Sequence, residues 1–243
     1  MPIPQTPNKT PTVIINQFFG AGDIIFCQSI ANRLVEDGYK VLWPVTDIYA
    51  PLAKHFPNIT MIDKKLLNID YMRRDEYEYN GCLVIPLRFS DSIMQVPYLD
   101  CMKSKYMLMG QDWEEWKENC IIKRDYDAEC ELFFDVLGLK VGEKYNLISE
   151  QFGTGGTRTT SIMVDNGLRN VDMKFIEGYT LIDWLKVMEH ATNIHVVSSS
   201  NIYLFELFPT IQGEINIYIR KPIEQNHDLY KYLLTSHNYI LHD

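Results

Sequence analysis

The sequence predicts an α/β protein with two Rossmann-like halves that face a cleft. Three observations carry this prediction. Short apolar runs of strand type alternate with segments of helical period along most of the 243 residues. A glycine turn joins a strand to a helix near the start of the chain, and a serine turn does the same near its end. Strands that alternate with helices favour parallel sheets with right-handed crossovers.

The first strand–helix–strand unit covers 12–43. Val13-Ile14-Ile15 is a short apolar strand, and the turn Gly20-Ala21-Gly22-Asp23 follows it closely. From Ile24 the apolar residues recur with the period of a helix, which Asp37-Gly38 ends. A second strand follows at 39–43. The glycines allow a sharp bend and leave room for a ligand beside the first helical turn.

Further elements complete a first half over 1–140 and a second half over 141–243, joined by a linker at 140–144. In the first half we expect a helix at 45–56, strands at 59–62 and 81–87, and a helix at 129–137. In the second half we expect strands at 145–149, 161–164, 194–197 and 215–219, a short extended run at 174–177, and helices at 181–191 and 202–208.

Composition narrows the class of protein. An apolar fraction of 46% is enough for a core, and a net charge of −9 argues against a general nucleic-acid surface. Five cysteines without CxxC spacing, and histidines without an HExxH pattern, predict neither zinc nor disulfides, so we expect no metal and no cofactor. No apolar run approaches the ~20 residues that span a bilayer. The proline-rich start has no apolar signal region, so we expect a cytoplasmic protein of unknown oligomeric state.

The glycine turn has three interpretations. It begins like a dinucleotide fingerprint, but Ile25 stands at the third glycine position and no acid ends the second strand. It could also be a purely structural turn. The third interpretation is a resemblance. Residues 19–34, F-G-A-G-D-I-I-F-x-x-x-I-A-N-R-L, resemble the opening of GT-B glycosyltransferases of the bacterial heptosyltransferase type.

A second stretch, 180–207, resembles the helix, buried strand, small-polar turn and helix near the nucleotide site of GT-B sugar transferases. The heptosyltransferase turn is typically Asp-Ser/Thr-Gly-x-x-His, whereas Ser198-Ser199-Ser200-Asn201 lacks the glycine and the histidine. Backbone N–H groups at a helix start and serine hydroxyls could bind a diphosphate. The alternative is an ordinary N-cap for the following helix.

Other polar residues are candidates for the donor site. The loop 151–158 contains glycines and threonines, and Thr154 and Arg158 could hold donor phosphates unless the loop is a plain surface hairpin. Glu177 could accept a hydrogen bond from a donor hydroxyl or be a solvated carboxylate. Arg169 is a weaker candidate. His195 lies inside an apolar strand and is expected to be a hydrogen-bonded core histidine.

Asp23 is the candidate for catalysis. In the families that the sequence resembles, the aspartate after the glycine turn is the proposed base, which takes the proton of the acceptor hydroxyl. The alternative is that Asp23 caps the helix beginning at Ile24. Gly20 and Gly22 would line the acceptor side of the cleft.

The resemblance implies a compact glycosyltransferase that moves a sugar from a nucleotide-sugar donor, bound by the second half, to a glycan or other hydroxyl acceptor, bound by the first. No metal would be required, and no DxD pair follows a strand. A non-catalytic nucleotide or sugar-phosphate binding protein is the alternative from another class. An NAD-dependent reductase or epimerase is a third possibility, but this sequence has neither the Tyr-x-x-x-Lys motif nor the fingerprint acid of such enzymes.

Overall fold

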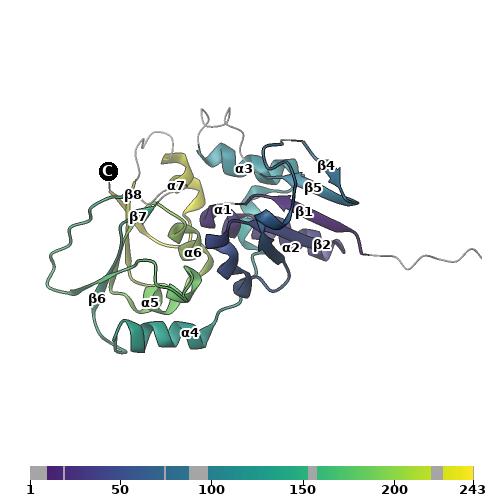
Figure 1. Ribbon diagram of the computed structural model, residues 1–243. Helices are drawn as coiled ribbons and strands as arrows, with labels where there is room; N and C mark the ends of the chain where they lie inside the picture. The colour runs from purple at the N-terminus through teal and green to yellow at the C-terminus, as the bar shows by residue number, and fades with distance from the viewer. Residues whose placement is uncertain are drawn as a thin grey trace, which may run out of the picture.

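The computed structural model describes residues 10–18, 20–73, 75–87, 98–152, 158–219 and 227–242. Two five-stranded sheets form the framework, one from each half of the chain, and helices lie between and beside them (Figure 1). Within these residues, no helix combines the length and the apolar character needed to cross a bilayer. The predicted α/β class with two mainly parallel sheets is confirmed.

The first sheet has the strand order β3-β2-β1-β5-β4, with every neighbouring pair parallel except β4 and β5. Its central strand β1 is buried at all but one position, because parallel strands in such a sheet are covered on both faces. The elements of this half are β1 (Thr12–Asn16), α1 (Ala21–Phe26), α2 (Gln28–Glu36), β2 (Lys40–Val45), the 3-10 helix η1 (Asp47–His55), β3 (Thr60–Asp63), the 3-10 helix η2 (Lys64–Leu66), β4 (Tyr77–Tyr79), β5 (Cys82–Pro86), α3 (Tyr98–Leu108) and the 3-10 helix η4 (Trp113–Lys117).

The second sheet has the order β12-β11-β10-β6-β9 and is parallel throughout. A two-stranded antiparallel hairpin of β7 and β8 accompanies it. The elements are α4 (Tyr126–Glu131), the π-helix η5 (Leu132–Val136), β6 (Tyr145–Ser149), β7 (Gln151–Phe152), β8 (Arg158–Thr159), β9 (Arg169–Asp172), the 3-10 helix η6 (Ile182–Trp184), α5 (Leu185–His190), β10 (Asn193–Val197), α6 (Asn201–Leu207), β11 (Glu214–Tyr218), α7 (His227–Leu233) and β12 (Tyr239–His242).

The strand expected at 161–164 is wrong, and the short extended run expected at 174–177 is not part of a sheet. Residues 161–164 and 174–177 form no strand, and the strand between them is β9. Only Val171 of β9 is buried, so this edge strand carries no apolar run for the sequence to reveal. The edge strand β12 is likewise exposed or half-buried at all four positions, and it was not predicted.

Helix α4 lies along the second half although it precedes the expected boundary (Figure 1). Arg124, just before α4, contacts Glu129 on α4 and donates to both carboxylate oxygens of Glu189 on α5 at 2.6 and 2.8 Å. Opposite charges held in this fork-like geometry fix α4 against α5. The boundary between residues 140 and 141 stays a prediction.

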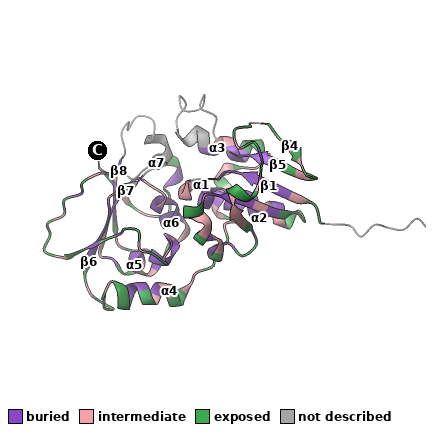
Figure 2. Cartoon of the chain, viewed as in Figure 1, coloured by how far each residue is buried: buried purple, intermediate pink, exposed green. Residues whose placement is uncertain are grey.

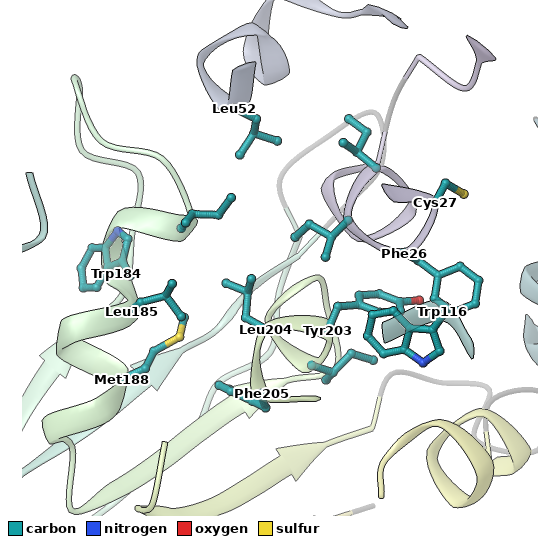
Figure 3. Close-up of a cluster of buried hydrophobic side chains, with 14 of the residues drawn as sticks. Phe26, Cys27, Leu52, Trp116, Trp184, Leu185, Met188, Tyr203, Leu204 and Phe205 are labelled. Atoms are coloured by element: carbon teal, nitrogen blue, oxygen red, sulfur yellow. The ribbon is translucent and has the colours of Figure 1, made fainter. Parts of the chain in front are cut away.

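One apolar core runs through both halves. Figure 2 shows the buried residues gathered where the sheets and the central helices meet, and Asn201–Glu206 of α6 are all buried. Phe26 and Trp116 from the first half face Tyr203 from the second (Figure 3), and each ring centroid lies 5.7 Å from that of Tyr203. The junction of the two halves therefore contains packed aromatic and aliphatic side chains from both.

We predict that the chain unfolds in one cooperative transition, because its two sheets share this core. Phe26→Ala should lower the free energy of unfolding by about 3–5 kcal/mol, the usual cost of removing a buried aromatic ring. Phe175→Ala is the matched control, since Phe175 is 83% exposed, and should change that free energy by less than about 0.5 kcal/mol. Urea denaturation followed by tryptophan fluorescence and circular dichroism measures both. Two separate transitions would contradict a shared core.

Candidate functional site

Asp23 lies in the first turn of α1, just beyond the carboxyl end of β1. The N-cap of α1 is Gly20, whose φ of +87° is a left-handed conformation that glycine adopts without strain. Because the helix begins at Ala21, Asp23 is its third residue, and the interpretation of Asp23 as the helix cap is wrong. A negative charge in the first turn is nevertheless stabilised by the helix dipole. The carboxylate side chain is 15% exposed, so it remains within reach of solvent or a ligand.

A buried lysine holds this carboxylate. Lys105 on α3 is 1% exposed, and its ammonium forms an ion pair with Oδ1 of Asp23. The same Nζ donates to Oε1 of Gln17 at 3.1 Å. An ammonium this deeply buried requires such partners, because desolvating it unpaired is costly. The position of the Asp23 carboxylate is thus fixed by a side chain that lies 82 residues further along the chain.

The glycine turn makes room for this arrangement. A Cβ on Gly20 would lie 2.5 Å from Oδ2 of Asp23, closer than any contact the carboxylate could tolerate. The Tyr49 hydroxyl also faces the turn. Burial raises its pKa, the backbone amides of Gly20 and Ala21 oppose that rise, and the charge of Asp23 adds to it. Position 20 therefore requires glycine for two reasons: its backbone has a positive φ, and a side chain would collide with the Asp23 carboxylate.

The serine turn follows β10 and opens α6. Ser198 is buried, whereas Ser199 and Ser200 are half-buried. Ser200 is the N-cap residue of α6, but its side chain makes no capping hydrogen bond, so the ordinary capping interpretation is not realised. Buried Asn201 donates from Nδ2 to Oγ of Ser149 at 3.1 Å, which ties the start of α6 to the end of β6.

The two turns meet across the junction of the halves. A Cβ on Gly22 would lie 2.7 Å from Cε2 of Tyr203 and 3.4 Å from Cα of Ser200. Helices α1 and α6 thus approach each other where α1 has no side chain (Figure 1). The structure brings together Asp23, Gly20 and Gly22 from one half with the serine turn from the other. Both turns follow strands at their carboxyl ends, where open α/β sheets bind ligands.

The remaining candidate residues lie away from the two turns or have side chains outside the part of the structure that is described. Glu177 is exposed in a turn that Tyr179 N–H closes on the Ile176 carbonyl at 3.1 Å. Thr154 lies outside the described residues, and of Arg158 only the backbone, in β8, is described. Arg169 opens β9 at the amino ends of the strands, where it contacts Glu143 at 3.2 Å and the Leu137 carbonyl at 2.7 Å.

His195 is 9% exposed, with Nδ1 3.4 Å from the Tyr218 hydroxyl. Burial lowers its pKa, and the charge of His242 adds to that effect, while Glu214 opposes it. The neutral imidazole is thereby favoured, as is expected of a core histidine.

Lys105 and Gln17 are the residues of this site that the sequence did not reveal. The segment around Lys105 shows scattered methionines and one proline, Pro97, without a clear period, and a second lysine, Lys103, stands two residues before Lys105. Lysine is among the residues least often buried, so composition pointed to a solvated side chain. Only the packing of α3 against α1 identifies Lys105 as the partner of Asp23.

Metal chemistry and thiol chemistry receive no support here. Across the described ranges, no three His, Cys, Asp or Glu side chains gather into a group that could hold a metal ion. Cys27 adjoins α1 and Cys120 lies further along the junction, and burial raises the pKa of each thiol to about 12. Protonated thiols are poor nucleophiles and poor metal ligands.

Comparison with known proteins agrees with the fold described above. No model of a protein family matches the sequence. Among solved structures, the chain is similar to a family 9 glycosyl transferase from Veillonella parvula DSM 2008, with a TM-score of 0.54 and 8% identity over 98% of this chain and 88% of that one. It is also similar to the dodecameric iron-containing heptosyltransferase TibC in complex with ADP-D-beta-D-heptose, with a TM-score of 0.50 and 11% identity.

A second TibC structure, from enterotoxigenic E. coli H10407, has a TM-score of 0.49 at 10% identity. The TibC matches cover 86% of this chain but 58% of TibC, so this chain spans little more than half the length of that protein. At these identities the likeness concerns the fold. At that level it confirms the GT-B-like architecture and the resemblance to heptosyltransferase-type glycosyltransferases.

We predict that Gly22→Ala destabilises the chain, although alanine normally stabilises a helix interior by about 1 kcal/mol relative to glycine. The added methyl group must displace the Tyr203 ring, at a cost of about 1–3 kcal/mol in the free energy of unfolding. In a Tyr203→Ala background, Gly22→Ala should no longer lower the free energy of unfolding by this amount. A double-mutant cycle by urea denaturation checks the coupling. Equal effects of Gly22→Ala in both backgrounds would show that the two helices do not meet at this point.

Proposed function

We propose that the chain is a glycosyltransferase that transfers a sugar from a nucleotide-sugar donor to a hydroxyl acceptor, with Asp23 as the base. The observation that carries the proposal is the placement of Asp23. Its carboxylate is held by Lys105 in the first turn of α1, next to Gly22, whose Cα faces Ser200 of the serine turn in the opposite half. Transfer to a hydroxyl needs a group that accepts the hydroxyl proton as the new glycosidic bond forms.

The donor diphosphate is proposed to bind at the turn 198–201. Backbone N–H groups at the start of a helix and the half-buried hydroxyls of Ser199 and Ser200 are suited to phosphate oxygens. The fold likeness to TibC, whose structure contains an ADP-sugar, supports a nucleoside diphosphate sugar as the donor class. The acceptor would then approach from the first half, on the side of Gly20. We further propose that no metal ion takes part, which assay in excess chelator tests.

The Lys105 ion pair favours the second candidate function, a nucleotide or sugar-phosphate binding protein without catalysis. A carboxylate paired with a buried ammonium can fix the arrangement of a site without taking part in proton transfer. For catalysis, Oδ1 would stay with Lys105 while Oδ2 serves the acceptor hydroxyl. The two functions differ in what the negative charge of Asp23 does. In the transferase it accepts a proton as well as pairing with Lys105, whereas in the binding protein it only pairs with Lys105.

Substrates are identified first by thermal shift with nucleoside diphosphates and their sugars, ADP-heptose among them, followed by an assay for release of the nucleotide. We predict that Asp23→Asn lowers kcat by about 10²–10⁴-fold, the usual contribution of a positioned base, with donor affinity largely retained. Because this change leaves Lys105 without a counter-charge, part of any loss could come from reduced stability.

The double variant Asp23→Asn/Lys105→Gln is the matched control, since two neutral amides can hydrogen-bond in place of the ion pair. It should recover stability relative to Asp23→Asn while activity stays low. Recovery of activity together with stability would remove Asp23 from the mechanism and favour the binding protein. If no nucleotide, nucleotide sugar or sugar phosphate shifts the melting temperature, both functions fail.

A further inference from the structure

A buried polar cluster joins the two halves at the end of η1. His55, the last residue of η1, has 0% exposure, and so does the side chain of Asp183 in η6. Thr180, which precedes η6, is also buried. The backbone of Lys123, in the segment that crosses between the sheets, completes the cluster. The His55 ring is therefore the point where the first half, the crossing segment and the second half meet.

Both nitrogens of that ring face hydrogen-bond acceptors. Nδ1 of His55 lies 2.8 Å from the Lys123 carbonyl, which can only accept, so Nδ1 must carry a proton. Nε2 lies 2.8 Å from Oγ1 of Thr180 and 3.4 Å from Oδ1 of Asp183. The Thr180 hydroxyl lies 2.8 Å from Oδ2 of Asp183, to which it donates.

Counting protons decides the state of the ring. Three contacts, Nδ1 to carbonyl, Nε2 to hydroxyl and hydroxyl to carboxylate, each need one proton. The threonine hydroxyl supplies one and a neutral imidazole supplies one, which leaves one contact without a proton. If the hydroxyl turned to donate to Nε2, two oxygens would face each other at 2.8 Å with nothing between them. The third proton must therefore come from an imidazolium or from a protonated carboxyl group.

The carboxyl group is the less favourable place for that proton. Burial alone would raise the pKa of Asp183, but contacts with His55, the Thr180 N–H, Lys54 and the Thr180 hydroxyl outweigh it and hold that pKa well below its usual range. The Thr180 N–H donates to Oδ2 at 2.6 Å, and Nζ of Lys54 lies 2.9 Å from Oδ1. Each of these contacts is made to an ionised carboxylate.

The charged groups around the ring are those of the elements that meet there. Lys54, from η1 itself, bridges Asp183 and Asp125, whose oxygen lies 3.1 Å from the ammonium. An imidazolium would give this cluster two positive and two negative charges. The side chains of Lys54 and Asp125 reach solvent, at 35% and 40% exposure, so the buried part of the cluster is the contact between His55 and Asp183. A neutral ring would leave the buried Asp183 carboxylate without a charged partner on that buried side.

We propose that His55 is a protonated latch between the two halves, doubly protonated when they are docked, and that loss of one ring proton loosens the docking. The proton that leaves Nε2 removes the hydrogen bond to Thr180 and the attraction to Asp183, and the junction then opens locally. Docking is complete at low pH and weakens as pH rises, because the deprotonated ring has one donor fewer. The latch needs no ligand and does not depend on the proposed transfer reaction.

Nitrogen-15 NMR of the ¹⁵N-histidine-labelled full chain tests the protonation state directly. At neutral pH both ring nitrogens of His55 should show the shifts of protonated nitrogen. The signal is assigned in the wild-type chain by correlating the ring with its own backbone resonances, and its absence in His55→Gln checks the assignment. Exposed His190 provides the reference for a ring in solvent. A single protonated nitrogen on His55 would overturn the proposal, and this measurement on the wild-type chain stands even if the variant does not fold.

Hydrogen exchange tests the latch itself. The Lys123 amide, bonded to the His55 carbonyl at 2.8 Å, and the Thr180 amide report on the junction. Corrected for intrinsic exchange, their protection should fall about tenfold from about pH 5 to about pH 8, the equilibrium effect of losing one charged hydrogen bond. The protection of the β1 amides should not change in this way with pH. His55→Gln should abolish this pH dependence and the control His190→Gln should keep it. An unchanged pH dependence in His55→Gln would show that the ring is not the latch.

Discussion

The close approach of α1 and α6 at Gly22 is the constraint on which the rest of this molecule depends. A bare Cα on α1 faces the Tyr203 ring and the start of α6. This contact lets Phe26 pack against Tyr203, so that the cores of two separate sheets become one (Figure 3). The same contact brings the turn that carries Asp23 up to the serine turn. A single steric requirement therefore links the stability of the junction to the geometry of the candidate site.

Buried charge is placed along this junction at several points, and apolar side chains fill the space between them. Lys105 pairs with Asp23 inside the first half, whereas Lys54 and His55 pair with Asp183 between the halves. Buried ion pairs rarely increase net stability over apolar replacements, but losing one partner of a pair is costly. They specify one arrangement of the halves. At Asp23 the ion pair involves Oδ1, whereas the Asp183 carboxylate faces Lys54, His55 and Thr180 together.

The parts of the fold that could be predicted from the sequence are those whose periodicity reflects burial. Strands such as Ile194–Val197 are covered on both faces and read as apolar runs, and the glycine and serine turns follow the ends of β1 and β10. Edge strand β9 buries Val171 alone, so its sequence resembles a loop. The site was predicted in part: both turns were found, but the cap role considered for Asp23 is wrong and Lys105 was missed. A contact over 82 residues leaves no local pattern, because it depends on how α3 packs against α1.

A crystal structure of the chain with the nucleotide sugar that stabilises it most tests the central claim most directly. The account predicts the diphosphate within hydrogen-bond distance of the backbone N–H groups of Ser199, Ser200 or Asn201, with the sugar directed toward Asp23 across the contact between α1 and α6. The Lys105 ion pair should be retained in that complex. A nucleotide bound elsewhere, such as in the shallow hollow beside Lys117 and Glu206 at the other end of α6, would contradict the account.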